Sequence, residues 1–297
     1  MTSEIQQIRA QIAEMGMSKL DLPEQRAAFD ASGDQLPMPP GTNVSEVMVG
    51  GVSCEALLPP DVDSNKVVFW LHGGGYGVGS AKSHRGFLAQ LSKCAGSAGM
   101  AANYRLAPEH PFPAAVDDAV AAYQGLLAEG VKPADLVVGG DSAGGGLALA
   151  MGMKLKELGA PMPAGFYLIS PWANLENTGW SYDAKASRDP VLSKEELDKW
   201  AVAYAQGQNR SDPLMSPVNG DLRGLPPVYI QVGEAEILLS DSSLLAERLG
   251  GAGVPVSMEV WPDMLHVWHI FYPNLAPARD AILRAGAWIK GHLGDTA

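Results

Sequence analysis

The chain has 297 residues, of which 46% are hydrophobic and 18% charged, and its formal net charge is −12 at pH 7. This composition is typical of a compact globular protein with a sizeable core. The acidic balance disfavours nucleic acid and anionic membranes as partners, because such binding relies on clustered Lys and Arg. We therefore expect neither as a partner.

The N-terminal residues and the cysteines bear on the compartment. Residues 1–16 carry acidic and polar side chains where a signal peptide would have a basic segment followed by an apolar one. No run approaches the roughly 18 consecutive apolar residues that span a bilayer. Cys54 and Cys94 are the only cysteines, and free, buried thiols are the expected state of both. These features predict a cytoplasmic location.

The pattern begins helical and then becomes a series of strands and helices. Residues 3–28 have apolar side chains at helical spacing, and 30–41 is rich in Pro and Gly, which predicts a linker. The apolar runs 44–49 and 52–58 flank two glycines and predict a β-hairpin. Further strands are predicted at 67–72, 100–106, 136–140, 165–170, 228–233 and 256–261, and helices at 81–97, 113–129, 143–158, 194–206, 240–250 and 277–292.

Strands that alternate with helices predict an α/β fold with a mostly parallel sheet, covered on both faces by helices. The hairpin would add antiparallel strands at one edge. Residues 171–226 interrupt the alternation and are too many for a simple crossover. Ligands in open α/β sheets bind outside the carboxyl ends of the strands. We therefore predict that 171–226 and the N-terminal 1–40 form a cap over a core made of 41–170 and 227–297.

The two cap segments carry more large apolar side chains than ordinary surface loops do. Since ligand sites are lined mainly by apolar and aromatic groups, some of these side chains should face the pocket, whereas the others attach the cap to the core. The candidates are Met15, Met17, Met38, Trp172, Trp180, Tyr182, Trp200 and Tyr204.

The strongest chemical signal is the segment Gly140-Asp141-Ser142-Ala143-Gly144, which fits the pattern G-x-S-x-G. It lies between a predicted strand and a predicted helix, the context in which this pattern lifts a nucleophilic serine out of a sharp turn. The start of a helix also favours developing negative charge. The context therefore predicts Ser142 as a nucleophile rather than as an incidental serine in a glycine-rich turn.

A second motif, His72-Gly73-Gly74-Gly75, directly follows another predicted strand. Backbone N–H groups in a glycine-rich turn can point into a site and stabilise a tetrahedral oxyanion. The two motifs together are typical of lipases and esterases, and neither nucleotide-phosphate pattern fits this loop. We predict that the N–H groups of Gly74, Gly75 and Ala143 form an oxyanion hole, and that His72 and Gly73 shape the loop.

Five segments occur in an order and spacing that carry a family resemblance: HGGGYGVGS at 72–80, YRLAPEHPFPAAVDDA at 104–119, GDSAGG at 140–145, DPLMSPV at 212–218 and VGEAEILLSD at 232–241. Together they resemble the bacterial hormone-sensitive-lipase family from about residue 40 onward. The resemblance implies an α/β-hydrolase fold and an esterase without a cofactor, with a cap from the N-terminus and a mid-chain insertion. The family includes lactone hydrolases, so lactones are a second expected substrate class.

The base should be a histidine late in the chain, because the order in this fold is Ser, acid, His. His266 and His269 are the candidates, and the resemblance places the base at His266. His269 is the alternative, with packing as its other possible role. The spacing H-x-x-H differs from that of zinc helices, so we expect no metal.

The acid should follow the strand predicted at 228–233, where Glu234, Glu236 and Asp241 lie. Many relatives have Asp-Pro-Leu-Arg-Asp in this place, and alignment of the strand end puts Glu236 at the position of their first Asp. A carboxylate of either length can accept the imidazole N–H. Glu236 is therefore the predicted acid. Asp241, which otherwise resembles an N-terminal helix residue, and Glu234 stay open as alternatives.

These residues predict hydrolysis of short-to-medium, neutral esters or lactones through an acyl-enzyme intermediate. An acyltransferase with the same triad and an inactive ligand receptor on the same fold are the alternatives. The expected partner is the small substrate alone, and a homodimer stays open. Five polar residues near the motifs are predicted to be structural: Tyr104, Arg105, Glu109, Asp117 and Asp141.

Overall fold

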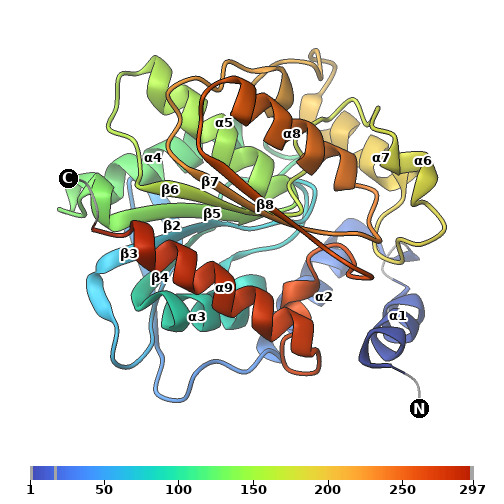
Figure 1. The fold of residues 1–297 in the computed structure, drawn as a ribbon, viewed down its shortest axis with the longest axis horizontal. Coiled ribbons are helices and arrows are strands. Elements are labelled where there is room, and N and C mark those ends of the chain that lie inside the picture. The colour runs from blue at the N-terminus through green and yellow to red at the C-terminus, as the bar shows by residue number, and fades with distance from the viewer. Residues whose placement is uncertain (1–2, 17–18, 295–297) are drawn as a thin grey trace.

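The computed structural model describes residues 3–16 and 19–294. Its centre is an eight-stranded sheet in the order β1-β2-β4-β3-β5-β6-β7-β8, with helices on both faces (Figure 1). The α/β class predicted from the sequence is confirmed. The strands are β1 (Asn43–Val49), β2 (Val52–Leu58), β3 (Asp63–Leu71), β4 (Ser97–Ala102), β5 (Leu136–Asp141), β6 (Gly165–Ile169), β7 (Val228–Gly233) and β8 (Val256–Trp261).

The strands from β4 to β8 in this order are parallel, whereas β1 and β2 form an antiparallel edge. The predicted hairpin is present, with Val49 opposite Val52. Gly50 and Gly51 have φ angles of 57° and 84°, and a two-residue turn with positive φ at both positions requires such glycines.

The helices cover the sheet on two sides. In Figure 1, α3 (Ala81–Ala95) and α9 (Ala276–His292) lie on one face, and α4 (Ala114–Ala128), α5 (Ala143–Glu157) and α8 (Leu239–Gly251) lie on the other. Strand β3 supplies side chains to both cores: Phe69 and Leu71 pack on the α5 side, whereas Val68 and Trp70 pack on the α3 side. A strand buried on both faces is continuously apolar, which explains the run that predicted it.

The N-terminal segment differs from its prediction, because it forms two helices and the second runs into the predicted linker. Helix α1 (Glu4–Met15) ends at Gly16 in the left-handed conformation, and α2 (Leu22–Asp34) begins with a capping box at Asp21. A Cβ at Gly33 would lie 2.3 Å from the carbonyl oxygen of Lys82. The glycine that suggested a linker thus allows α2 to pack closely on α3.

The bounds of one strand also differ from the prediction. Strand β4 covers 97–102 rather than 100–106, so the last residues of that prediction lie in a loop. The remaining elements are α6 (Ser181–Ala184), α7 (Lys194–Ala205) and the 3₁₀ turns η2 (Pro133–Asp135), η3 (Pro217–Asn219) and η4 (Trp268–Phe271).

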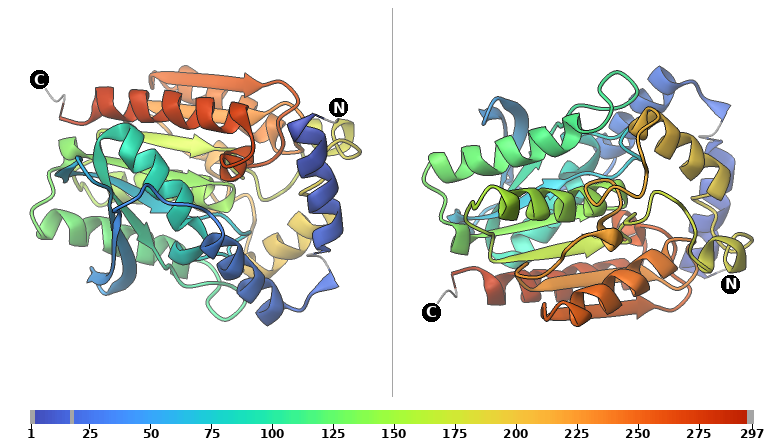
Figure 2. Two further views of the ribbon diagram at one scale, coloured as in Figure 1. Left: turned by 90° about the horizontal axis from the view of Figure 1, so that it is seen from below. Right: turned by 90° about the horizontal axis from the view of Figure 1, so that it is seen from above.

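Helices α1, α2, α6 and α7 gather at the end of the sheet where the parallel strands have their carboxyl ends (Figure 2). They belong to the two segments predicted as cap. The segments meet directly, because Arg9 of α1 donates a hydrogen bond of 2.5 Å to the carbonyl oxygen of Arg188. Two predicted pocket residues, Met17 and the side chain of Met15, lie outside the described part of the chain.

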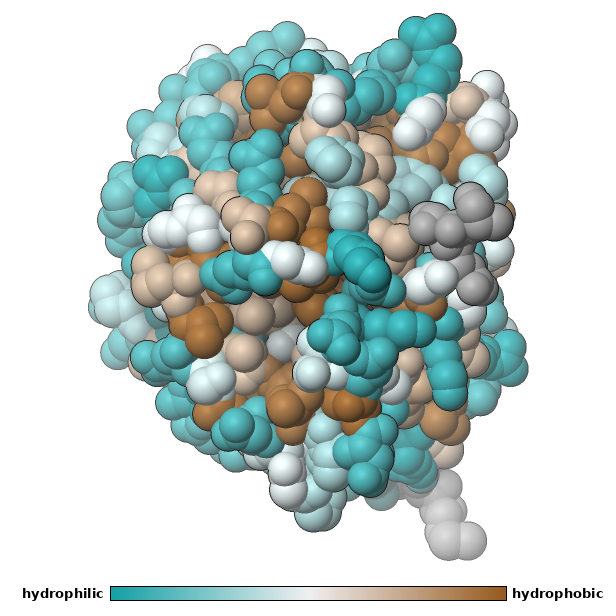
Figure 3. Space-filling model, turned by 90° about the vertical axis from the view of Figure 1, so that its left-hand side faces the viewer, coloured by the Kyte–Doolittle hydropathy of each residue, from teal (hydrophilic) through white to brown (hydrophobic). Residues whose placement is uncertain are grey.

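The face of the molecule turned away from these four helices carries hydrophobic residues interspersed among hydrophilic ones (Figure 3). Within residues 3–16 and 19–294, no helix combines the length and the apolar character needed to cross a membrane.

Candidate active site

Ser142 lies in the turn between β5 and α5, as predicted. Its φ and ψ are 53° and −122°, a conformation that costs a non-glycine residue about 1–3 kcal/mol. The flanking glycines make the turn possible, since a Cβ at Gly144 would lie 1.9 Å from the carbonyl oxygen of Leu71, and one at Gly140 would lie 2.3 Å from that of Gly144. The glycines thus allow the tight turn that places the serine directly after the carboxyl end of β5, an interior strand of the sheet.

His266 and Glu236 form a buried pair. The imidazole Nδ1 lies 2.7 Å from Glu236 Oε2, and Glu236 is fully buried. Its other oxygen accepts hydrogen bonds from the Ser170 hydroxyl at 2.7 Å and from the Gly233 N–H at 2.6 Å. Burial lowers the pKa of His266, but the hydrogen bond and the charge of Glu236 outweigh it, so that the pKa is raised.

Ser170 connects the three strand ends that carry the predicted triad. Its neighbour Ile169 accepts a hydrogen bond from the N–H of Ser142 at 2.9 Å. Its own hydroxyl donates to Glu236 and accepts, at 3.3 Å, from the N–H of Val267, the residue after the predicted base. One side chain at the end of β6 therefore fixes the acid loop and the histidine loop beside the turn that holds Ser142.

The atoms predicted to react, Ser142 Oγ and His266 Nε2, have no partner in the protein among the described residues. Within the described part of the chain, Ser142 Oγ and His266 Nε2 make no hydrogen bond, and neither belongs to the fully buried polar atoms that lack a partner. Both are therefore accessible. In enzymes of this chemistry, the contact between nucleophile and base often tightens only when the substrate is bound.

The glycine-rich loop is attached to the residue beside Ser142. Asp141 Oδ1 accepts hydrogen bonds from the Gly73 N–H at 3.0 Å and from Trp70 Nε1 at 3.1 Å. Gly74 and Gly75 follow with φ angles of 114° and 60°, which side chains other than hydrogen rarely tolerate. The predicted structural role of Asp141 is thus to place this loop next to the serine.

The N–H groups predicted to hold an oxyanion have no other partner. Among the described residues, the backbone N–H groups of Gly74, Gly75 and Ala143 donate to no protein acceptor. Ala143 is the first residue of α5, where the helix leaves N–H groups unpaired and its dipole favours negative charge. The three groups are available to an anionic oxygen.

His72 makes contacts suited to shaping the loop. Its ring stacks on Tyr104 with a centroid distance of 4.2 Å, and its Nδ1 lies 2.7 Å from the carbonyl oxygen of Gly73. The hydroxyl of Tyr104 donates to the carbonyl oxygen of His72 at 2.6 Å. Burial lowers the pKa of His72 to about 3, so the ring is neutral at neutral pH and carries no proton to a substrate.

The alternative acids are engaged elsewhere. Asp241 accepts hydrogen bonds from the N–H groups of Ala173 and Asn174 and from the hydroxyl of Tyr182, at 3.1, 2.9 and 3.0 Å. It therefore fixes the segment after β6, rather than only starting a helix. Glu234 pairs with Lys185 and, at 2.6 Å, with Arg188.

The alternative base is also engaged. His269 is fully buried, and its Nε2 lies 2.9 Å from Gln231 Oε1. Burial lowers its pKa to about 3. Of the candidates described here, Glu236 and His266 are the acid and the base that contact one another.

The segment 104–119, which includes the start of α4, differs in one detail from the prediction. Arg105 forms its ion pair with Asp118 at 2.8 Å, whereas Asp117 is exposed. Glu109 binds Arg26 of α2, with contacts of 2.7 and 2.8 Å to the two guanidinium nitrogens. The sequence could not distinguish the adjacent aspartates, because only the direction of each side chain on α4 separates them.

The two predicted cap segments contact the glycine-rich loop. A Cβ at Gly75 or Gly77 would lie 2.8 or 2.0 Å from ring atoms of Trp200 on α7. From α2, Arg26 Nε donates to the carbonyl oxygen of Gly77 at 2.9 Å, and Nη2 donates to that of Ala107 at 3.0 Å. The loop predicted to carry the oxyanion donors is thus contacted by both predicted cap segments.

Sequence reasoning missed Ser170, Arg26 and Asp189, which contacts the loop after β7. None of them belongs to a motif with its own chemistry. The turn residues Asp189-Pro190 were a visible signal, but nothing in the pattern shows which distant loop they face. The predicted cap aromatics divide: Trp172, Tyr182 and Tyr204 are buried, Trp200 is half-buried, and Trp180 is 58% exposed.

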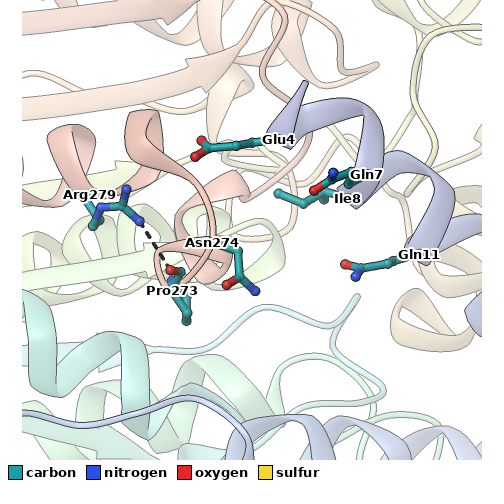
Figure 4. A pocket seen from close by; sticks show the side chains of 7 residues that line it. All are labelled: Glu4, Gln7, Ile8, Gln11, Pro273, Asn274 and Arg279. Atoms are coloured by element: carbon teal, nitrogen blue, oxygen red, sulfur yellow. Dashed lines mark hydrogen bonds between the residues drawn. The ribbon is translucent and has the colours of Figure 1, made fainter. Parts of the chain in front are cut away.

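A cavity of about 400 Å³ lies between α1 and the start of α9, and its polar side chains face one another across the gap in Figure 4. None of the predicted site residues lines it. The lining residues are Glu4, Gln7, Ile8, Gln11, Pro273, Asn274 and Arg279. No group of three or more His, Cys, Asp or Glu side chains with metal-binding geometry occurs in the described residues.

The chain is similar to known proteins over most of its length. An acetyl-hydrolase of Streptomyces hygroscopicus is 42% identical over 273 residues, which cover 91% of this chain and 90% of that protein. A family model described as alpha/beta hydrolase fold matches residues 68–270. The solved structure of an esterase from the bacterial hormone-sensitive lipase family superposes with a TM-score of 0.95 at 39% identity, and covers 98% of both chains.

The chain belongs to the bacterial hormone-sensitive-lipase family. A further solved structure, of EstE5 soaked with p-nitrophenyl butyrate, superposes with a TM-score of 0.93 at 38% identity, and covers 98% of both chains. The resemblance seen in the motifs is thus confirmed, and with it the α/β-hydrolase fold. The protein is a carboxylesterase of this family.

Proposed function

We propose that the protein hydrolyses carboxylic esters through a triad of Ser142, His266 and Glu236 and an acyl-enzyme intermediate. The observation that carries the proposal is the buried hydrogen bond of 2.7 Å between His266 Nδ1 and Glu236, beside a serine in a strained turn. A carboxylate in this position fixes the imidazole tautomer and leaves Nε2 unprotonated and able to accept the serine proton.

The reaction has two balanced halves. His266 Nε2 takes the proton of Ser142 Oγ as the oxygen attacks the ester carbonyl, and the resulting oxyanion accepts hydrogen bonds from Gly74, Gly75 and Ala143. The tetrahedral intermediate collapses, the bond to the alcohol oxygen breaks, and the imidazolium protonates that oxygen. Water, deprotonated by His266, then attacks the acyl-enzyme. The second tetrahedral intermediate collapses, the bond between the acyl carbon and Ser142 Oγ breaks, and the imidazolium returns its proton to Oγ as the acid leaves.

Short-to-medium, neutral esters and lactones are the substrate class that we favour. The surroundings of the glycine-rich loop are aromatic: Trp200 contacts it, and Tyr76 within it stacks on Tyr204 with a centroid distance of 3.8 Å. Such walls favour compact hydrophobic groups over charged ones. Similar proteins are an acetyl-hydrolase and an esterase that was soaked with p-nitrophenyl butyrate, so acetyl and butyryl esters are the first substrates to try.

The test is a panel of p-nitrophenyl esters from acetate to long acyl chains, together with neutral lactones. We expect the largest kcat/KM on short or medium chains, and a loss on the order of 10³-fold or more in the variant Ser142→Ala. Product analysis at a fixed alcohol concentration separates hydrolysis from acyl transfer. Retained turnover in Ser142→Ala would contradict the proposed triad, and dominant transfer to the alcohol would favour the acyltransferase.

A further inference from the structure

Asp189 is a buried carboxylate outside the predicted triad. It lies five residues after α6, in the segment 171–226, and is 9% exposed. Its side chain faces the loop after β7, where Glu236 lies. No motif of the sequence includes it.

Both carboxylate oxygens of Asp189 accept hydrogen bonds from backbone N–H groups. Oδ1 accepts from Val191 at 2.9 Å and from Leu192 at 3.0 Å, and Oδ2 accepts from Ile237 at 2.9 Å. Three donors and no acceptor around a carboxyl group match its ionised form, which can only accept. These hydrogen bonds hold the side chain in one orientation and stabilise its anionic form, whereas burial raises the pKa of the carboxyl group.

The hydrogen bond between Asp189 and Ile237 lies one residue away from Glu236, the proposed acid of the triad. Ile237 follows Glu236, whose side chain binds His266, so Asp189 fixes the backbone on which the acid is mounted. Of the carboxylates near the imidazole, Glu236 contacts it directly, whereas Asp189 and Asp141 act on it through their charge. Burial lowers the pKa of His266, and the charges of these three groups raise it.

The charge of Asp189 is not cancelled by a neighbour. Within the described residues, no Lys or Arg forms an ion pair with it, and the guanidinium of the adjacent Arg188 binds Glu234 and Asp263 instead. An uncompensated carboxylate in a buried site acts on a nearby imidazolium more strongly than a surface one, because little water screens it.

We propose that Asp189 is a positioning residue: from the mid-chain insertion it holds the Glu236 loop in place and stabilises the imidazolium form of His266. This inference rests on the proposed triad. It assigns the insertion a role in the proton transfer, in addition to that of covering the site.

The test is the pH dependence of kcat/KM for p-nitrophenyl butyrate. Activity should rise with pH as free His266 loses its proton. Removing the charge of Asp189 makes the imidazolium less stable, so its pKa falls and the acidic limb should move to lower pH, by about half a unit or more. Asp189→Asn and Asp189→Ser both remove the charge but differ in size, and either can still accept a backbone hydrogen bond in the turn.

The matched control is Asp183→Asn, which removes an exposed carboxylate from α6 in the same segment and should leave the limb in place. The position of a limb does not depend on the fraction of folded enzyme, so a loss of protein does not obscure the result. A shift to lower pH in both variants supports the proposal, and an unmoved limb in both overturns it, whatever the loss of activity. Failure of the proposed triad would give a different result, because the variant Ser142→Ala would then hydrolyse the ester as fast as the wild type.

Discussion

The loop that carries the proposed acid and the loop that carries the proposed oxyanion donors are held by different kinds of contact. On the acid side, the loop after β7 is joined to the segment 170–189 by buried hydrogen bonds, from Ser170 to Glu236, from Ile237 to Asp189 and from the chain at 173–174 to Asp241. On the oxyanion side, the outer face of the loop at 73–79 is covered by one ring and one guanidinium, and that guanidinium side chain is 31% exposed.

The difference divides the predicted cap insertion into two parts. Residues 171–189 belong structurally to the acid loop, because their buried polar groups are paired with it, and a buried partner left unpaired costs about 1–3 kcal/mol. Helix α7 instead presents Trp200 to the glycine-rich loop. We therefore expect changes on the acid side to reduce kcat or stability, and changes to the cap contacts on the oxyanion side to alter kcat/KM while the core stays folded.

The largest effect should come from the acid itself. Glu236→Gln should lower kcat by about 10³–10⁴-fold, because the amide no longer holds the imidazole in the required tautomer. Asp241→Asn should lose far less activity, since Asp241 contacts the segment after β6 rather than His266. Steady-state kinetics of the two variants would check this, and the reverse order would make Asp241 the acid.

The next effect concerns the N-terminal segment. Deletion of residues 1–30 removes Arg26, which binds the carbonyl oxygens of Gly77 and Ala107. We expect kcat/KM to fall by about 10- to 100-fold, because small displacements of oxyanion donors are costly, whereas the thermal transition of the core should move little. The point variant Arg26→Ala should show the same change in part. Wild-type kinetics and selectivity in the truncated protein would show that the N-terminal segment is not part of the cap over the site.

A smaller effect is expected on α7. Trp200→Ala removes the ring that lies against Gly75 and Gly77, so the loop gains freedom and kcat/KM should fall by roughly 10-fold. Val202→Ala, on the same helix but 63% exposed, is the control and should behave like the wild type. Equal kinetics of both variants would show that the ring does not hold the loop.

The smallest effect is on the pH dependence of stability. Burial raises the pKa of Asp241 to about 7, above its value in the unfolded chain of about 4. The folded state therefore binds the proton more tightly, and this group makes the free energy of unfolding fall as pH rises between these two values. Denaturant unfolding at several pH values gives the free energy of unfolding of the wild type and of Asp241→Asn. A difference in this free energy that does not change with pH would contradict the raised pKa of Asp241.

How far the sequence predicted this site depends on the distance along the chain over which each contact acts. The turn at Ser142 and the glycine loop after β3 are local, so their glycines and flanking strands identified them. The Glu236 candidate needed only the end of one strand. By contrast, the hydrogen bond from Ile237 to Asp189 joins residues 48 positions apart. No pattern in the sequence shows that these two loops contact one another.

The same reason explains the differences in the fold. The predicted strands and helices were recovered because buried runs and periodic apolar faces are visible in the sequence alone. The prediction of a linker from residue 30 was wrong, because α2 continues to Asp34. Gly33 and Ser32 favour a turn in isolation, whereas packing against α3 requires the glycine within a helix. Tertiary contact decided what local propensity could not.

The most direct test of the central claim is mass spectrometry after reaction with a serine-directed organophosphate. We expect one covalent adduct per chain, located on Ser142, with activity lost in proportion to the labelled fraction. Ser142→Ala should fold, remain unlabelled and hydrolyse no ester. An adduct on another residue, or substantial esterase activity in the alanine variant, would contradict the assignment of Ser142 as the nucleophile.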